Sequence, residues 1–187
     1  MKTLRAAAVA VVALLALVLP VGAATADEWA TDQFTGDHDS LDQVRLTHAR
    51  LNVFLHTSWE GDFYPEGDVY YWLDTRRSSP GPEFRVKVYL DEFNSSGKAI
   101  PGTTIDRIDG FDSGVGRELH CGVRGWLSKA GDVDVTVPRS CLRYRGKLPA
   151  SVRMSVGVMF AYGGPDFNGS WAWSPGRHQF GPWVAHD

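Results

Sequence analysis

Two carboxylates, Asp74 and Glu83, flank the short loop 75–82 and are the first candidates for chemistry. Calcium takes its oxygen ligands from carboxylates on loops of this kind, so the pair is a candidate calcium site. The alternative is a role in the turn, in which Asp74 caps the loop and Arg76 or Arg77 pairs with Glu83. We favour the turn and keep calcium as the candidate cofactor.

Aromatic side chains are the second candidate, because the chain has seven Trp, six Tyr and nine Phe. Trp171 and Trp173 are one residue apart, so an extended backbone places both indoles on one face. Trp59 lies beside an acidic loop, and Tyr70 lies in an aromatic run. Recognition of a sugar ring needs flat aromatic faces next to hydrogen-bonding groups, so we predict that these four residues bind ligand. The alternative is that Trp171 or Trp173 closes one end of the core.

Motifs for catalysis are missing from the sequence. It has no G-x-S-x-G elbow, and its six dispersed histidines form no H-E-x-x-H pattern. The acidic run 106–112 lacks the spacing of an EF-hand loop. A glycosidase needs two carboxylates across a cleft, and a sequence does not show such a distance. We therefore predict no catalytic residue and favour a protein that is not an enzyme.

The first 26 residues have the composition of a secretory signal peptide. Lys2 and Arg5 precede the apolar run 6–19, and Ala24-Thr25-Ala26 is a small-x-small cleavage signal. The run has fourteen residues, short of the roughly 20 that a membrane-spanning helix needs. We predict that residues 1–26 are cleaved, that the protein is secreted, and that no membrane span remains.

The net charge of the mature chain limits which partners are expected. Without Lys2 and Arg5 the mature chain has 17 basic and 22 acidic residues, a formal charge of −5. The basic residues are scattered singly or in pairs along the sequence, so nucleic acid is not an expected partner.

The two cysteines, Cys121 and Cys141, are predicted to form a disulfide in an oxidising compartment, stabilising the fold by about 3 kcal/mol.

The elements that must position these residues are predicted to be β-strands. Apolar and polar residues alternate in runs separated by turns rich in Gly, Pro, Asn and Ser. The runs cover 44–48, 51–55, 69–74, 84–90, 133–137 and 152–160, and 139–142 is expected to form one helical turn. This pattern predicts an all-β fold, a single antiparallel β-sandwich of Ig-like or jelly-roll topology with one disulfide. We place the sandwich domain at 43–187, after a flexible N-terminal arm at 27–42.

Several of these runs carry short motifs that resemble a group of small secreted actinobacterial proteins with no assigned activity. The recurring elements are V-R-x-x-H, L-D-T, G-P-E-[FY]-R-V, V-P-R-x-C-L and F-x-P-W-V, here at 44–48, 73–75, 81–86, 137–142 and 180–184. The resemblance spans most of the mature chain and implies origin and compartment, but no chemistry.

A looser similarity is to DOMON-like sandwiches, including family-nine carbohydrate-binding modules. In these folds a strand that ends in an aspartate is followed by a loop and an aromatic-rich strand, and Asp74, Glu83 and Phe84 fit that outline. The similarity implies a sandwich fold and ligand binding.

Three function classes follow, in order of preference. The first is a secreted, non-catalytic module, expected to be a monomer, that binds a carbohydrate or a related extracellular ligand. The second is an extracellular structural or protein-interaction domain, such as an inhibitor. The third is a hydrolase that uses a pair of carboxylates.

Overall fold

The computed structural model describes the larger part of the chain beyond the predicted signal peptide. The described residues are 27–32, 35–36, 41–59, 67–79, 81–89, 101–128, 132–160 and 170–186. The predicted signal peptide therefore lies outside them. No helix among the described residues is both long and apolar enough to cross a membrane.

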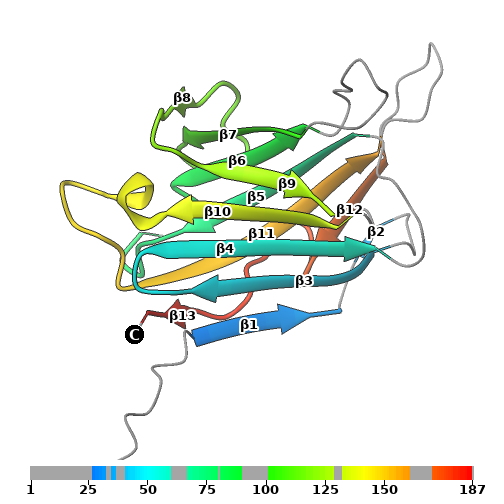
Figure 1. Cartoon of the computed structure of the whole chain (residues 1–187), viewed down its shortest axis with the longest axis horizontal. Coiled ribbons are helices and arrows are strands. Elements are labelled where there is room, and N and C mark those ends of the chain that lie inside the picture. Colours follow the sequence, from blue (N-terminus) through cyan, green and yellow to red (C-terminus); the bar gives the residue numbers. More distant parts are fainter. Residues whose placement is uncertain are drawn as a thin grey trace, which may run out of the picture.

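A five-stranded antiparallel sheet forms one layer, in the order β1-β3-β4-β10-β9 (Figure 1). Each strand alternates because one face of the sheet is buried and the other is in solvent. Along β4, for example, Val53, Leu55 and Thr57 point inward, whereas Phe54 and His56 point outward. The bounds are β1 (Asp27–Thr31), β3 (Leu41–His48), β4 (Asn52–Trp59), β10 (Val133–Pro138) and β9 (Arg124–Leu127).

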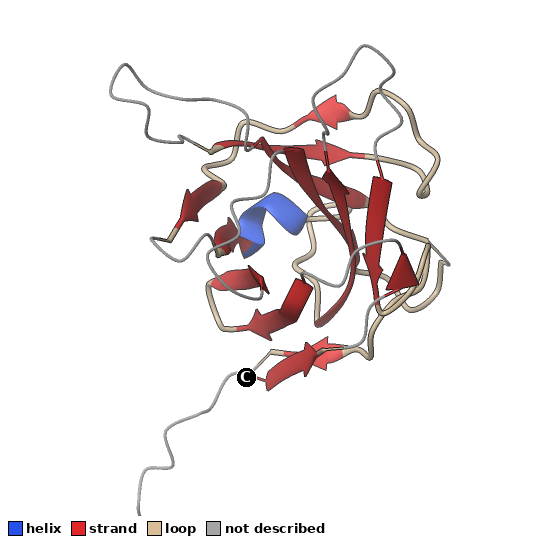
Figure 2. Ribbon diagram, turned by 90° about the vertical axis from the view of Figure 1, so that its right-hand side faces the viewer, coloured by secondary structure: helices blue, strands red, loops and turns tan. Residues whose placement is uncertain are grey.

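The second layer is a larger antiparallel sheet in the order β2-β12-β11-β5-β6-β7-β8, with β13 paired to the start of β11. Figure 2, turned by 90° from Figure 1, shows the two layers on either side of the core. The bounds are β2 (Thr35–Gly36), β5 (Gly67–Asp74), β6 (Phe84–Tyr89), β7 (Gly102–Arg107), β8 (Arg117–Glu118), β11 (Ser151–Phe160), β12 (Ser170–Ser174) and β13 (Val184–Ala185).

The core lies between the layers and is built from the inward residues of both sheets. Most are β-branched or aromatic side chains that suit a pleated surface, such as Val44, Val86 and Phe84. A polar contact also crosses the core, where Thr57 Oγ1 lies 2.8 Å from Tyr71 Oη. Burial raises the pKa of Tyr71 well above its ordinary value.

The predicted all-β sandwich with one disulfide is confirmed. Cys121 and Cys141 are bonded, with their Cα atoms 5.5 Å apart. The expected helical turn is also present as the 3₁₀ helix η1 (Arg139–Leu142), shown in blue in Figure 2. The disulfide joins this turn to the segment that leads into β9.

The segment 27–42, which we expected to be a flexible arm, contributes strands to both layers. β1 pairs in register with β3, and β2 pairs with β12. Trp29 explains the docking of β1, because its indole packs so closely on Gly181 that a Cβ there would lie 2.5 Å from Cζ2 of Trp29. One apolar side chain among polar neighbours was too weak a pattern to predict a strand.

Candidate functional site

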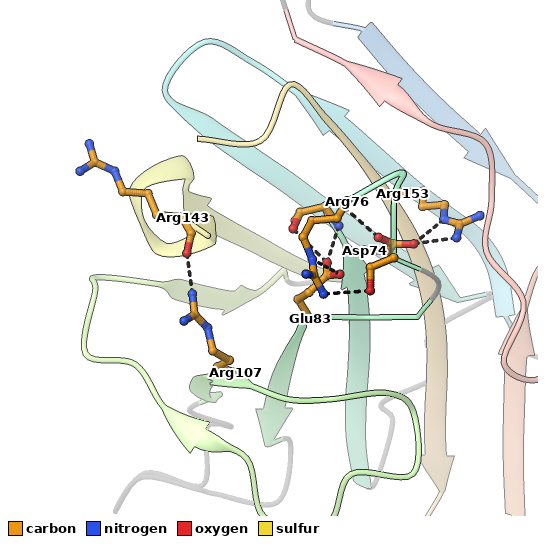
Figure 3. Close-up of polar contacts among 8 residues, drawn as sticks. Asp74, Arg76, Glu83, Arg107, Arg143 and Arg153 are labelled. Carbon is orange, nitrogen blue, oxygen red and sulfur yellow. Dashed lines mark hydrogen bonds and ion pairs between the residues drawn. The ribbon is translucent and has the colours of Figure 1, made fainter. Parts of the chain in front are cut away.

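Asp74, the first loop carboxylate, is fully buried and fully engaged (Figure 3). Its Oδ2 accepts hydrogen bonds from Nε and Nη2 of Arg153 at 2.8 and 2.6 Å. Its Oδ1 accepts a bond of 3.0 Å from the backbone N–H of Arg76, which caps the turn. A buried carboxylate paired with a guanidinium and a backbone amide has its charge compensated without a metal.

Glu83, the second loop carboxylate, braces the same turn. Its Oε2 accepts from the backbone N–H and the hydroxyl of Thr75 at 2.8 and 3.0 Å, and its Oε1 accepts from Arg76 Nε at 2.7 Å. The hydrogen bond to Glu83 raises the pKa of Arg76. No group of three or more His, Cys, Asp or Glu residues able to hold a metal occurs within the described segments. The geometry of both carboxylates fits the turn role that we favoured.

Residues of two motifs, 137–142 and 180–184, make close contacts in the fold. The guanidinium of Arg153 lies between the rings of Phe180 and Trp183, at 4.5 and 4.7 Å from their centroids. Arg139 donates to the carbonyls of Arg50 and Pro149, both at 2.7 Å. Phe180, Trp183 and Arg139, which belong to these motifs, thus take part in the packing and hydrogen bonding of the fold.

The predicted aromatic residues Tyr70, Trp171 and Trp173 form a continuous stack with Trp72 on the outer face of the larger sheet. Successive ring centroids are 5.1 to 5.6 Å apart. Gly157 makes the stack possible, since a Cβ at this position would lie 2.8 Å from Cζ3 of Trp72. Sequence spacing predicted that the indoles share a face, and they do.

Much of this stack is covered. Trp72 and Trp173 are only 5% and 9% exposed, because Phe111, His178 and Phe180 from two loops pack over them. Here the aromatic residues form a second small core. Tyr70 and Trp171 remain half-buried at its margin.

A polar cluster lies next to Tyr70. Its hydroxyl donates to Asp68 Oδ2 at 3.0 Å, and Lys87 Nζ lies 2.5 Å from the same oxygen. Burial and the neighbouring Asp68 charge raise the pKa of Tyr70. Trp59, the fourth predicted ligand residue, is buried in the main core, so its ring has no open face for a sugar.

A different surface combines exposed rings with polar groups. It is a groove of about 290 Å³ on the outer face of the five-stranded sheet. Five large hydrophobic side chains of the described residues are exposed, and two of them are aromatic: Phe54 at 40% and Trp126 at 46%. Both line this groove. The full lining is Arg45, Thr47, Phe54, Leu55, His56, Trp126, Asp134 and Val135.

Strand register builds the polar floor of the groove. Arg45 on β3 lies opposite His56 on β4, His56 lies opposite Asp134 on β10, and Asp134 lies opposite Trp126 on β9. One row of outward side chains thus crosses four strands.

Two polar features stand out in this row. His56 Nδ1 lies 2.9 Å from Asp134 Oδ1, so the carboxylate orients the imidazole and leaves Nε2 for another partner. Arg45 donates to the neutral amide oxygen of Gln43, and no described carboxylate pairs with it. Among the described residues Asp134 is the one carboxylate that lines the groove, whereas glycoside hydrolysis by the usual mechanism needs two. The arrangement is suited to binding.

These groove residues were absent from the sequence prediction. The signal was Phe54, an apolar ring at an outward position of an alternating strand. The exposure of Trp126 was harder to predict, because β9 has only four residues and was not predicted as a strand.

Comparison with known proteins adds no identification. No protein-family model, no curated protein and no solved structure matches the chain. The candidate site therefore has to be judged on its own geometry.

Proposed function

We propose that the protein is a secreted, non-catalytic module that binds saccharide rings in the groove on the outer face of the five-stranded sheet. One observation carries this proposal. Phe54 and Trp126, exposed at 40% and 46%, line the same groove as Arg45, His56 and Asp134. The predicted signal peptide supports the secreted location.

The chemistry of the groove matches a sugar ring. A pyranose has an apolar face of C–H bonds, which an indole or phenyl ring covers, and a rim of hydroxyls that donate and accept hydrogen bonds. Arg45 supplies donors, Asp134 supplies acceptors, and His56 Nε2 is an acceptor in the neutral tautomer that donates Nδ1–H to Asp134. The residues come from adjacent strands of a rigid sheet, so little conformational entropy is lost on binding.

Binding to insoluble polysaccharides in pull-downs and to soluble oligosaccharides by calorimetry tests the proposal, with and without calcium. Burying about 80 Å² of the Trp126 ring is worth roughly 2 kcal/mol, so Trp126→Ala should weaken binding about 30-fold. Phe54→Ala should act in the same direction. Leu148→Ala, which truncates another exposed apolar side chain, is the matched control and should bind normally.

The outcomes separate the alternatives. If no polysaccharide binds above background, the saccharide proposal is wrong and the protein-interaction class takes its place. If Trp171→Ala abolishes binding while Trp126→Ala does not, the margin of the Tyr70–Trp171 stack is the site and the groove assignment fails.

A further inference from the structure

Basic residues gather at one end of the sandwich, although they look scattered in the sequence. The segment 139–147 contains four basic and no acidic residues. It forms η1 and the turns that follow it, at the left of Figure 1, next to the end of β7 and to β8. This end of the sandwich is thus basic although the net charge of the chain is negative.

Several cations at this end of the sandwich, including two from β7 and β8, lack a carboxylate partner. Elsewhere in the described structure Arg76, Arg85, Lys87 and Arg153 each pair with a carboxylate. Five basic side chains at this end have no such partner among the described carboxylates. They are Arg107, Arg117, Arg143, Arg145 and Lys147.

Three of them line one cleft of about 400 Å³ beside the disulfide. Arg107, Arg117 and Arg143 face it together with Ser140, and Glu118 is the only carboxylate among its lining residues. Glu118 lies 3.6 Å from His120, at an exposed position. The cleft therefore has an excess of two positive charges.

Arg107 is held in place for binding. Its Nη2 donates to the carbonyl of Arg143 at 2.5 Å (Figure 3), and its guanidinium lies 5.5 Å from the centroid of Phe84. Its Nε is buried and has no hydrogen-bond partner among the described residues. A guanidinium that is already fixed loses little entropy when it donates a hydrogen bond to an oxyanion.

The hairpin after Arg143 provides an independent observation. Tyr144 and Lys147 exchange both backbone hydrogen bonds at 3.1 Å around a two-residue turn, Arg145-Gly146. The φ angles of these two residues are 48° and 80°, so an arginine occupies a left-handed position that favours Asn, Asp or Gly. The strained backbone displays an exposed cation at the tip, and strain of this kind is concentrated at functional sites.

We propose that the cleft and the hairpin tip bind oxyanion groups repeated along a flexible anionic polymer. Arg107, Arg117 and Arg143 hold one anionic group, and Arg145 with Lys147 contacts the next. Nucleic acid fits less well, because single strands are bound by stacking on exposed rings and no aromatic residue lines the cleft. Tyr144, in the hairpin, is already covered by Arg76, whose Cζ lies 4.1 Å from the ring centroid.

Titrations with polyphosphate, polygalacturonate and single-stranded DNA of similar length test this inference. Both sugar-free polyphosphate and carboxylate-bearing polygalacturonate should bind, with affinity that falls as salt rises. The variant R117Q/R143Q should weaken both by about tenfold or more, since each lost charge-assisted contact costs roughly tenfold or more. The matched control is R124Q/R177Q, which removes two exposed arginines outside the cleft and should bind as the native protein does.

A second variant tests the hairpin tip. Arg145→Asn relieves the left-handed strain, so it should raise the unfolding temperature while it weakens polymer binding. A lower unfolding temperature with unchanged binding would overturn the role of Arg145.

Four results would refute the proposal as a whole. The first is no binding of either polymer. The second is equal loss of binding in the control, which would mean diffuse attraction. The third is DNA binding as tight as polymer binding and with the same response to R117Q/R143Q, which would assign the surface to nucleic acid. The fourth is loss of polymer binding in Trp126→Ala, which would place the polymer in the groove instead.

Discussion

Replacing Asp74 by alanine should destabilise the fold by about 3 kcal/mol, because it leaves Arg153 without its partner. Three hydrogen bonds end on the Asp74 carboxylate, two from Arg153 and one from the backbone of Arg76. Removing one partner of a buried ion pair costs about 3–5 kcal/mol. The lower end applies here, since the Arg153 side chain keeps 27% of its exposure and water partly replaces the carboxylate.

Thermal and urea unfolding, followed by circular dichroism, measure this loss. For a chain of this size each kcal/mol lowers the melting temperature by about 2–4 °C, so Asp74→Ala should melt roughly 6–12 °C lower. Arg153→Met preserves the packing between Phe180 and Trp183 and isolates the charge. The double variant should lose less than the two single variants together, by about 1–3 kcal/mol. Strict additivity would show that the pair does not act as a unit and would refute the reasoning.

The same assay distinguishes the turn from a metal site. A ligand that binds only the folded state raises the melting temperature. Since arginines and backbone amides occupy the oxygens of Asp74 and Glu83, millimolar calcium or EDTA should shift the melting temperature by less than about 1 °C. A calcium-dependent rise that Asp74→Ala abolishes would restore the calcium interpretation.

Three further predictions concern the core, the stack and the disulfide. Because burial raises the pKa of Tyr71 above 10.0, the unfolded chain loses this proton first as pH rises. The stability difference between native protein and Tyr71→Phe should therefore shrink by about 1.4 kcal/mol per pH unit above pH ~10 in urea titrations, and a constant difference would contradict the pKa shift. Gly157→Ala forces a Cβ against Trp72 and Trp173 and should cost about 1–3 kcal/mol with altered near-UV dichroism, whereas Gly114→Ala, with nothing within 4 Å, should be neutral. Reduction of Cys121–Cys141 should cost about 3 kcal/mol, and the unreduced, denatured protein should show no free thiol; two titratable thiols would disprove the bond in solution.

The sequence predicted those features that depend on neighbours along the chain. Alternation marked β4 and β6 because one face of each strand is buried and the other is more exposed, and the loop between Asp74 and Glu83 is braced by residues within ten positions. Features that depend on which strands become neighbours were not predictable. Arg153 is 79 positions from Asp74, and the row Arg45–His56–Asp134–Trp126 exists only because β10 lies between β4 and β9.

The exposure of a side chain could not be predicted from the local sequence pattern either. The pair Trp171 and Trp173 was correctly placed on one face, but the cover over Trp173 comes from Phe111 and the turn at His178. Spacing tells which side chains share a face, and only the tertiary fold decides whether that face reaches water.

The contact of Trp29 with Gly181 has a consequence for how the chain is made. β1, the first strand, lies beside β13, the last (Figure 1), and the indole of Trp29 rests on the segment that leads into β13. β13 pairs with β11 and not with β1, so the final residues support β1 by packing alone, and this support is complete only after they have been synthesised. Until then β1 and β3 lack part of their support, and an unpaired strand edge is open to other chains. A chain truncated before Gly181 should accordingly be prone to aggregate, even though it retains most of the core.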